Sequence, residues 1–335
     1  MSTERIHIVG PPRSGTTLMQ ALFATGFDID GVTAHEEGLW RRRPRGERIL
    51  LTKCPGDEVL APLLLPLDRH LWFVFMLRDP RDVVVSEHGQ EPGKYWSNLR
   101  VWREALQFHA KMKHHPRFVV VRYEDVVSRP DAIQEELVRR MPFLKPAVPF
   151  SRYHEYLEDH VSTSEQFNRA MRGVRPVTPD SIAAWRDHLP RVKAQLALHG
   201  GIAAELVEMG YERDNSWQTQ LDNVPHDQAE SLVPDQLPSR RRVQHVIRRW
   251  MRTIRYVYRR YIQAGGHTDG HNGGRGTDRG TVDAYQSTTW RGVPPGDAIS
   301  YLRTEDGTSA AQRHRRPSSA MIEGGTAVGL NHTIK

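Results

Sequence analysis

The sequence lacks the features that mark secreted, membrane-spanning or metal-binding proteins. Its 335 residues include one cysteine, Cys54, which excludes an internal disulfide and any metal site built from several cysteines. It contains no run of 18 apolar residues, so we expect no transmembrane helix. The opening MSTERIHIVG enters an apolar segment directly and leaves no room for a signal peptide. These absences predict a cytoplasmic protein, either soluble or peripheral to a membrane.

Positive charge is what the chain has in excess. Its net charge of +7 at pH 7 favours anionic ligands or surfaces. Hydrophobic residues make up 38% of the chain, which is low for a compact protein, so part of the chain should lie outside any core. The segment 263–335 holds 13 of the 26 glycines and has no sustained apolar period. It is predicted to be a disordered tail.

Four short apolar runs alternate with helical patterns in the first half of the chain. Continuous apolar runs are typical of strands buried on both faces of a sheet. They cover residues 5–9, 49–52, 72–77 and 118–121. Helices are expected at 16–25, 57–65, 95–114 and 129–141, and another begins at Pro80. The alternation predicts an α/β fold, a P-loop-like three-layer sandwich whose parallel sheet binds ligands at its carboxyl edge.

Composition divides the chain into four parts. Residues 1–217 are predicted to form one domain, and its last part, 151–217, is expected to be mainly helical. Residues 218–238 are polar and punctuated by proline, which indicates a linker. Residues 239–262 read as a basic amphipathic helix ahead of the tail. Apolar residues recur along this helix in steps of four and three: Val243, Ile247, Trp250, Ile254, Val257 and Tyr261.

This basic helix has three interpretations. It can lie on an anionic membrane surface, helped by Trp250 and its tyrosines. It can pair with another chain through its apolar seam. It can also dock on the preceding domain, although we favour the first two equally. Nucleic acid is not expected as a partner, because the aromatic side chains lie on the apolar seam and are poorly placed to stack on bases.

The segment IVGPPRSGTTLMQALF reads as a strand, a polar turn and a helix. Its glycine spacing is close to that of a Walker A loop, but Thr16 stands where that motif has lysine, and the positive charge is at Arg13. Backbone N–H groups and the positive end of the helix dipole at such a turn bind anions. A phosphate-like ligand is therefore predicted, with contacts from Arg13, Ser14, Gly15, Thr16 and Thr17.

A second cationic motif disfavours a metal-dependent nucleotide site. The third apolar run ends in Arg78-Asp79-Pro80-Arg81, so the acid that could imitate a Walker B residue lies between cations. Arg13 and Arg78, with Arg81 as a further candidate, favour a ligand that carries two separate anionic groups with no metal between them.

These motifs resemble the sulfotransferase family over residues 5–215. PPRSGTTLMQALF is similar to its 5′-phosphosulfate loop, and FVFMLRDPRDVVVSEHG to its 3′-phosphate motif. The resemblance implies that Arg78 and Ser86 bind the 3′-phosphate of 3′-phosphoadenosine 5′-phosphosulfate (PAPS), with Ser86 about two turns into a helix. MRGVRPVTPDSIAAWRDHL resembles the region that closes over the nucleotide, which implies a phosphate contact from Arg175.

Arginine in the loop resembles the branch that contains the bacterial and tyrosylprotein sulfotransferases. AHEEGLW is similar to the Glu-Glu segment of that branch, which implies Glu37 as the catalytic base, with His35 or Lys53 as alternatives. LTKCP resembles the K-x-P segment of that branch, which implies a role for Lys53. We expect Arg13 to stabilise the leaving oxygen, assisted by Lys53 or Thr16. The implied acceptor is a hydroxyl of a carbohydrate or glycoconjugate, with a peptide tyrosine as the alternative. The competing function is a P-loop nucleotide kinase or NTPase.

Overall fold

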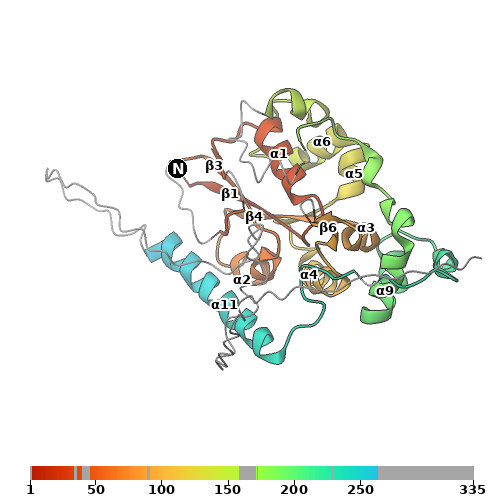
Figure 1. Ribbon diagram of the computed structural model, residues 1–335. Helices are drawn as coiled ribbons and strands as arrows, with labels where there is room; N and C mark the ends of the chain where they lie inside the picture. Colours follow the sequence, from red (N-terminus) through yellow and green to blue (C-terminus); the bar gives the residue numbers. More distant parts are fainter. Residues whose placement is uncertain are drawn as a thin grey trace, which may run out of the picture. The chain divides into compact units, whose positions relative to one another are not determined.

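The fold is built on a parallel sheet of five strands (Figure 1). The computed structural model describes residues 2–33, 36–39, 46–88, 91–157, 171, 173–227 and 229–262. The strand order is β2 (Gly31–Val32), β3 (Ile49–Lys53), β1 (Glu4–Val9), β4 (Leu71–Leu77) and β7 (Phe118–Arg122). The four apolar runs of the sequence form the four longer strands, and every neighbouring pair is parallel. The predicted α/β fold is confirmed.

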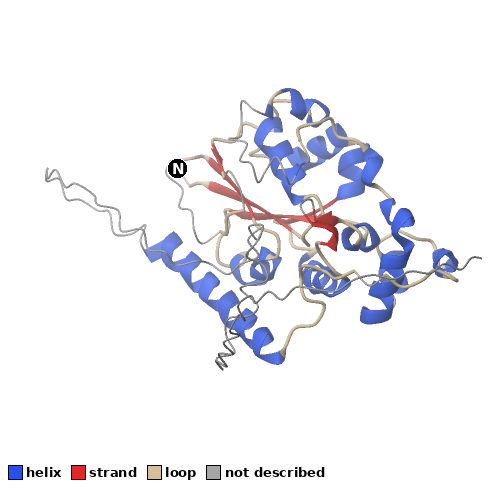
Figure 2. Ribbon diagram, in the orientation of Figure 1, coloured by secondary structure: helices blue, strands red, loops and turns tan. Residues whose placement is uncertain are grey.

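Helices cover both faces of this sheet, as Figure 2 shows. The reason lies in the alternation of side chains along each strand. On β4, Val74 and Met76 belong to one apolar core, while Phe73 and Phe75 belong to the other. The first face carries α1 (Thr16–Gly26), α5 (Tyr123–Ser128) and α6 (Pro130–Arg140); the second carries η1 (Asp57–Leu60), α2 (Ala61–Leu64) and α4 (Leu99–Met112).

The segment after β4 differs from its predicted helical form. Helix α3 (Pro80–Val84) ends before Ser86, so this serine does not lie two turns into a helix. A hairpin of β5 (Glu87–His88) and β6 (Glu91–Tyr95) follows, and the Trp96 N–H donates to the Ser86 carbonyl over 3.0 Å. Helix α4 consequently begins only at Leu99, where the Asn98 side chain caps it. Strand pairing has overridden the helical pattern at both ends of this hairpin.

The chain beyond the sheet forms a third apolar cluster around Trp185 and Trp217, whose rings meet edge to face at 5.9 Å. Residues 218–238, whose composition indicates a linker, lie along this part of the domain. Asn98 donates to the Val233 carbonyl over 2.8 Å, and Arg191 donates to Ser231 Oγ over 2.6 Å. The helices between α6 and the basic helix are η2 (Phe150–Glu155), η3 (Pro179–Ser181), η4 (Ala184–His188), α9 (Leu189–His199), α10 (Ala203–Glu208) and η5 (Ser216–Leu221). Of these, η2 packs in the first apolar core through Phe150 and Tyr153.

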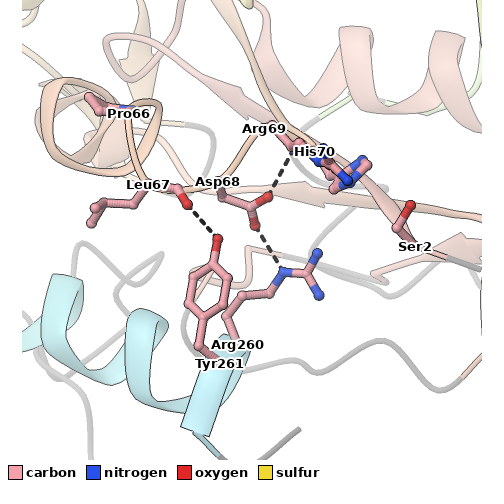
Figure 3. A pocket seen from close by; sticks show the side chains of 8 residues that line it. All are labelled: Ser2, Pro66, Leu67, Asp68, Arg69, His70, Arg260 and Tyr261. Atoms are coloured by element: carbon pink, nitrogen blue, oxygen red, sulfur yellow. Dashed lines mark hydrogen bonds and ion pairs between the residues drawn. The ribbon is translucent and has the colours of Figure 1, made fainter. Parts of the chain in front are cut away.

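The basic helix docks on the domain through its polar side. It comprises α11 (Ser239–Val257) and a π-helical turn, η6 (Tyr258–Ile262). Tyr256 is 2% exposed, and its hydroxyl donates to Asp68 Oδ2 over 2.6 Å. Arg260 pairs with the same carboxylate at 3.0 Å (Figure 3). Of the three interpretations of this helix, docking is the one that these contacts describe; the tail at 263–335 lies outside the described residues.

No helix in the described part of the chain combines the length and the apolar character that crossing a bilayer requires.

We expect Tyr256→Phe to lower the free energy of unfolding by about 1–3 kcal/mol, because Asp68 loses a hydrogen bond in a buried place. Tyr258→Phe is the matched control, since this tyrosine is 47% exposed on the same helical segment. Urea unfolding of both variants checks the expectation. Equal stabilities would show that the Tyr256 hydroxyl does not hold the helix to the domain.

Candidate functional site

The turn that joins β1 to α1 depends on two glycines in left-handed conformations. Gly10 has φ 137° and Gly15 has φ 93°. A Cβ on Gly10 would lie 2.5 Å from the Met76 carbonyl oxygen, and one on Gly15 would lie 2.6 Å from the Tyr123 ring. Any larger residue would push the turn away from its neighbouring strands. The two glycines therefore allow the amino terminus of α1 to lie close to the carboxyl edge of the sheet.

The amino terminus of α1 is open to an anion. Gly15 provides no side-chain cap, and the first turn contains no acidic residue. The first N–H groups of an α-helix have no acceptor within the helix, and the helix dipole adds positive potential there. Ser14 does not contribute its hydroxyl, because Ser14 Oγ donates to the Pro11 carbonyl over 2.7 Å and closes the turn. Thr16 is buried and Thr17 is half-buried at the start of the helix.

Arg13 and Ser86 lie side by side although 73 positions separate them. Arg13 Nε donates to Ser86 Oγ over 2.7 Å. Arg13 holds a positive φ of 74°, which few residues other than glycine adopt, and its carbonyl accepts from Arg78 NH1 over 3.0 Å. The structure thus brings together the cation of the loop and both residues of the second motif, even though Ser86 is not helical.

Arg78 lies directly after β4, and two of its guanidinium N–H groups donate to backbone carbonyls. It is 8% exposed, stacks over the Tyr123 ring at 4.2 Å, and donates through NH2 to the Ser181 carbonyl over 2.7 Å. Its Nε has no hydrogen-bond partner among the described residues. A buried donor without a partner is unfavourable.

Lys53 ends β3 on the other side of the loop. Its side chain is 1% exposed, so it is not a surface lysine. Lys53 Nζ lies 3.3 Å from Thr17 Oγ1 and 3.0 Å from Glu36 Oε1. Strand pairing sets this position, because Ile8, which lies two residues before the loop, pairs with Lys53 across the sheet.

The two glutamates of the acidic pair have different contacts. Glu36 holds the ion pair with Lys53. Glu37 donates its backbone N–H to the Lys53 carbonyl over 2.9 Å and is half-buried. Its carboxylate has no recorded partner among the described residues. His35, the alternative base, lies outside the described residues. Glu36 is a further acid that the structure brings to the loop, through its ion pair with Lys53.

Asp79 and Arg81 pair with each other and stabilise helix α3. Asp79 caps α3 by accepting from the Arg81 N–H over 2.8 Å, and the Arg81 guanidinium pairs with Asp79 and Glu212. The same guanidinium lies 4.1 Å over the Trp185 ring. Arg81, a candidate cation for the ligand, is therefore committed to packing α3. Asp79 is likewise used in these contacts with Arg81, and not as a metal ligand of the Walker B type.

Arg175 makes its backbone contact with Tyr153 and not with Arg13, Arg78 or Ser86. Its side chain is exposed, and its carbonyl accepts from the Tyr153 hydroxyl over 2.8 Å. The segment that follows does reach the site, because the Ser181 carbonyl contacts Arg78. Asp82 anchors that segment by accepting from the Ala183 and Trp185 N–H groups, each over 2.9 Å, and burial raises the pKa of Asp82 to about 6.

Sequence reasoning missed two residues that shape the loop. Tyr123 contacts both Gly15 and Arg78, and its place directly after β7 is a signal that the carboxyl-edge rule could have used. Glu58 lies beneath the loop, where its carboxylate accepts from the Gly10 N–H over 3.3 Å. Burial raises the pKa of Glu58 to about 7. No sequence pattern marks Glu58, because only the fold buries it.

The described residues contain no group of three His, Cys, Asp or Glu side chains that could hold a metal ion.

Comparisons with known proteins find structural neighbours but no matching family and no matching curated protein. The chain is similar to the sulfotransferase domain of the Synechococcus PCC 7002 olefin synthase, with 16% identity, TM-score 0.37, and coverage of 55% of this chain and 88% of that one. It is also similar to the sulfotransferase domain from the curacin biosynthetic pathway, with 15% identity, TM-score 0.33, and coverage of 56% and 98%. Retinol dehydratase in complex with androsterone and inactive cofactor PAP shares 14% identity at TM-score 0.32, with coverage of 67% and 83%. Likenesses this weak establish neither activity nor substrate.

We expect Glu58 to contribute a loss of stability as the pH rises from about 4.5 to about 7, because folded Glu58 binds its proton more tightly than unfolded Glu58 does. Glu58→Gln removes this contribution and keeps an oxygen for the Gly10 N–H. At pH 8 the variant should be more stable than the wild type by on the order of 2 kcal/mol. Urea unfolding across this pH range checks the expectation, with exposed Glu135→Gln as control. Parallel pH profiles for wild type and Glu58→Gln would contradict it.

Proposed function

We propose that this chain is a sulfotransferase, which moves the sulfuryl group of PAPS to an acceptor hydroxyl. The observation that carries the proposal is the contact between Arg13 and Ser86, with Arg78 bonded to the Arg13 carbonyl. It sets a second cationic centre against an open helix terminus. A ligand with two anionic groups at opposite ends of one nucleoside fits such a pair of centres.

Each centre suits one end of PAPS. The 5′-phosphosulfate would bind at the amino terminus of α1. There Gly15 has no side chain to keep the anion from the backbone N–H groups, and Thr16, Thr17 and Arg13 add donors. The 3′-phosphate would bind at Arg78 and Ser86. Arg78 brings to this centre a guanidinium group on a side chain that is 8% exposed. Bound nucleotide would compete with Ser86 for Arg13, which links the two centres.

The proposed reaction is an in-line transfer. The acceptor oxygen attacks sulfur, the bond from sulfur to the bridging oxygen breaks, and adenosine 3′,5′-bisphosphate leaves with the bonding electron pair. Positive groups near the bridging oxygen stabilise the charge that gathers there, and we assign this role to Arg13 with Lys53. Glu37 takes the proton of the acceptor hydroxyl. Glu36 positions Lys53 through their 3.0 Å ion pair.

A P-loop kinase or NTPase is the less well supported alternative. Thr16 occupies the Walker lysine position, and Asp79 accepts hydrogen bonds from Arg81 instead of facing the loop. Lys53 does bring an ammonium group to Thr17, so nucleotide binding has to be tested directly.

For the acceptor we propose a hydroxyl of a carbohydrate or glycoconjugate, with a peptide tyrosine as the alternative. The arginine of the loop and the acidic pair support an assignment to the branch with bacterial and tyrosylprotein sulfotransferases. We propose a cytoplasmic location for the reaction.

Calorimetry tests the nucleotide assignment. We expect the wild type to bind adenosine 3′,5′-bisphosphate without Mg²⁺ and to bind ATP poorly with or without it. Arg78→Ala should lower the affinity for the bisphosphate about 30- to 100-fold, because a charge-assisted contact to phosphate is lost. Exposed Arg139→Ala on α6 is the control. Tight ATP binding that requires Mg²⁺, with no bisphosphate binding, would replace the proposal by the kinase alternative.

Transfer of label from PAPS to acceptors in cell-lysate fractions tests the base. We expect Glu37→Gln to lower the rate by on the order of 10²–10⁴ while bisphosphate affinity stays unchanged, because only proton transfer is lost. Glu36→Gln should change nucleotide affinity as well, since it releases Lys53. Near-normal turnover of Glu37→Gln would move the base to Glu36, His35 or Lys53.

A further inference from the structure

The docked helix turns its polar side to the domain and its apolar side to solvent. Thr253 and Tyr256 are buried against the domain, and Arg252 NH1 pairs with Asp57 at 3.1 Å. Arg249 lies 5.5 Å from the Phe108 ring centre on α4. Docking thus uses the Tyr256 hydroxyl and the cations of α11, and the Tyr256 ring and half-buried Val257 pack on the second apolar core. Most of the other apolar residues of the helix lie on the opposite side, whereas an amphipathic helix ordinarily turns its apolar side to the core.

We call the exposed apolar side of this helix the outer stripe. A single exposed apolar residue is ordinary, but a continuous row of them marks an interaction surface. Seven of the ten large hydrophobic residues that are exposed in the described chain belong to this helix. The outer stripe comprises Val246 (57% exposed), Ile247 (51%), Trp250 (53%), Met251 (44%), Ile254 (63%), Tyr258 (47%) and Tyr261 (48%).

The stripe continues onto the domain at its carboxyl end. The Tyr261 hydroxyl donates to the Leu67 carbonyl, and Leu67 is itself 50% exposed (Figure 3). Arg260 fixes the same turn through Asp68. The apolar surface is therefore held in place at this end before any partner arrives, and its binding would not require the helix to form first.

The positive charge of this helix indicates which kind of partner can bind the outer stripe. Residues 239–262 contain nine arginines and no aspartate or glutamate. Arg255 and Arg259 are exposed, and at 100° per residue they border the stripe on the side away from Thr253. Two such helices packed along their stripes would set arginines against arginines with no carboxylate between them, which disfavours a second copy. The tail is no better complement, because residues 263–335 contain eight Lys and Arg against seven Asp and Glu.

We propose that the outer stripe binds the surface of an anionic lipid bilayer. Ile247, Met251 and Ile254 enter the boundary between headgroups and acyl chains. Trp250 and the tyrosines suit that boundary, since their rings are apolar and their N–H and O–H groups reach water. The bordering arginines meet lipid phosphates and carboxylates. This inference does not depend on the proposed sulfuryl transfer.

Vesicle cosedimentation of the full chain tests the proposal. We expect binding to phosphatidylcholine–phosphatidylserine vesicles, little binding to phosphatidylcholine alone, and weaker binding as salt is raised. A triple variant, Ile247→Ser with Trp250→Ser and Ile254→Ser, should bind at least about tenfold more weakly. It should keep its unfolding temperature, because the three side chains are exposed. Leu198→Ser with Val207→Ser, at exposed apolar positions elsewhere, is the matched control and should bind like the wild type.

Arg255→Gln with Arg259→Gln provides an independent readout. Each lost arginine should weaken binding to the anionic vesicles about fivefold. The absence of wild-type binding, or equal binding by the wild type and the triple variant, would overturn the proposal. So would a wild type that ignores vesicles but dimerises in sedimentation velocity while the triple variant remains monomeric, because the stripe would then face a second copy. Calorimetry with adenosine 3′,5′-bisphosphate on the triple variant should give the affinity of the wild type, which separates a loss of vesicle binding from damage to the nucleotide site.

Discussion

The position of the first loop against the sheet edge is the constraint on which the other features of the site depend. Gly10 lies against the backbone of β4, and Gly15 lies against the ring of Tyr123. Neither place has room for a Cβ. Because the loop is this close, Arg78 reaches the Arg13 carbonyl from one neighbouring strand and Lys53 reaches Thr17 from the other. Moving the loop outward would separate all of these groups.

Around this loop, buried acids serve as supports for the site. Asp79 holds Arg81, and Asp82 holds the segment that carries Ser181 to Arg78. Glu58 accepts from Gly10 beneath the turn. Burial raises the pKa of both Glu58 and Asp82.

The basic helix shares the same foundation. Asp57, which pairs with Arg252, also lies 3.3 Å from His7 of β1, and the adjacent Gly56 N–H donates to the Gly10 carbonyl over 3.3 Å. A chain of polar contacts therefore runs from α11 to the first residue of the loop. Helix docking and loop position are parts of one packed structure, and the apolar side of the helix is left for another surface.

The sequence by itself determined the four longer strands of the sheet and the glycine loop, because apolar periodicity and glycine spacing are local properties. It also identified Arg13, Arg78 and Ser86 as candidate anion ligands. It did not determine where Ser86 lies, since pairing with the β5–β6 hairpin overrode a helical pattern. The apolar repeat predicted helix α11. Which side of that helix faces the domain depends on ion pairs with Asp57 and Asp68, which are distant in sequence. Only the tertiary structure could bury Glu58, engage Arg81 and join Lys53 to Glu36, because each depends on partners that no local pattern identifies.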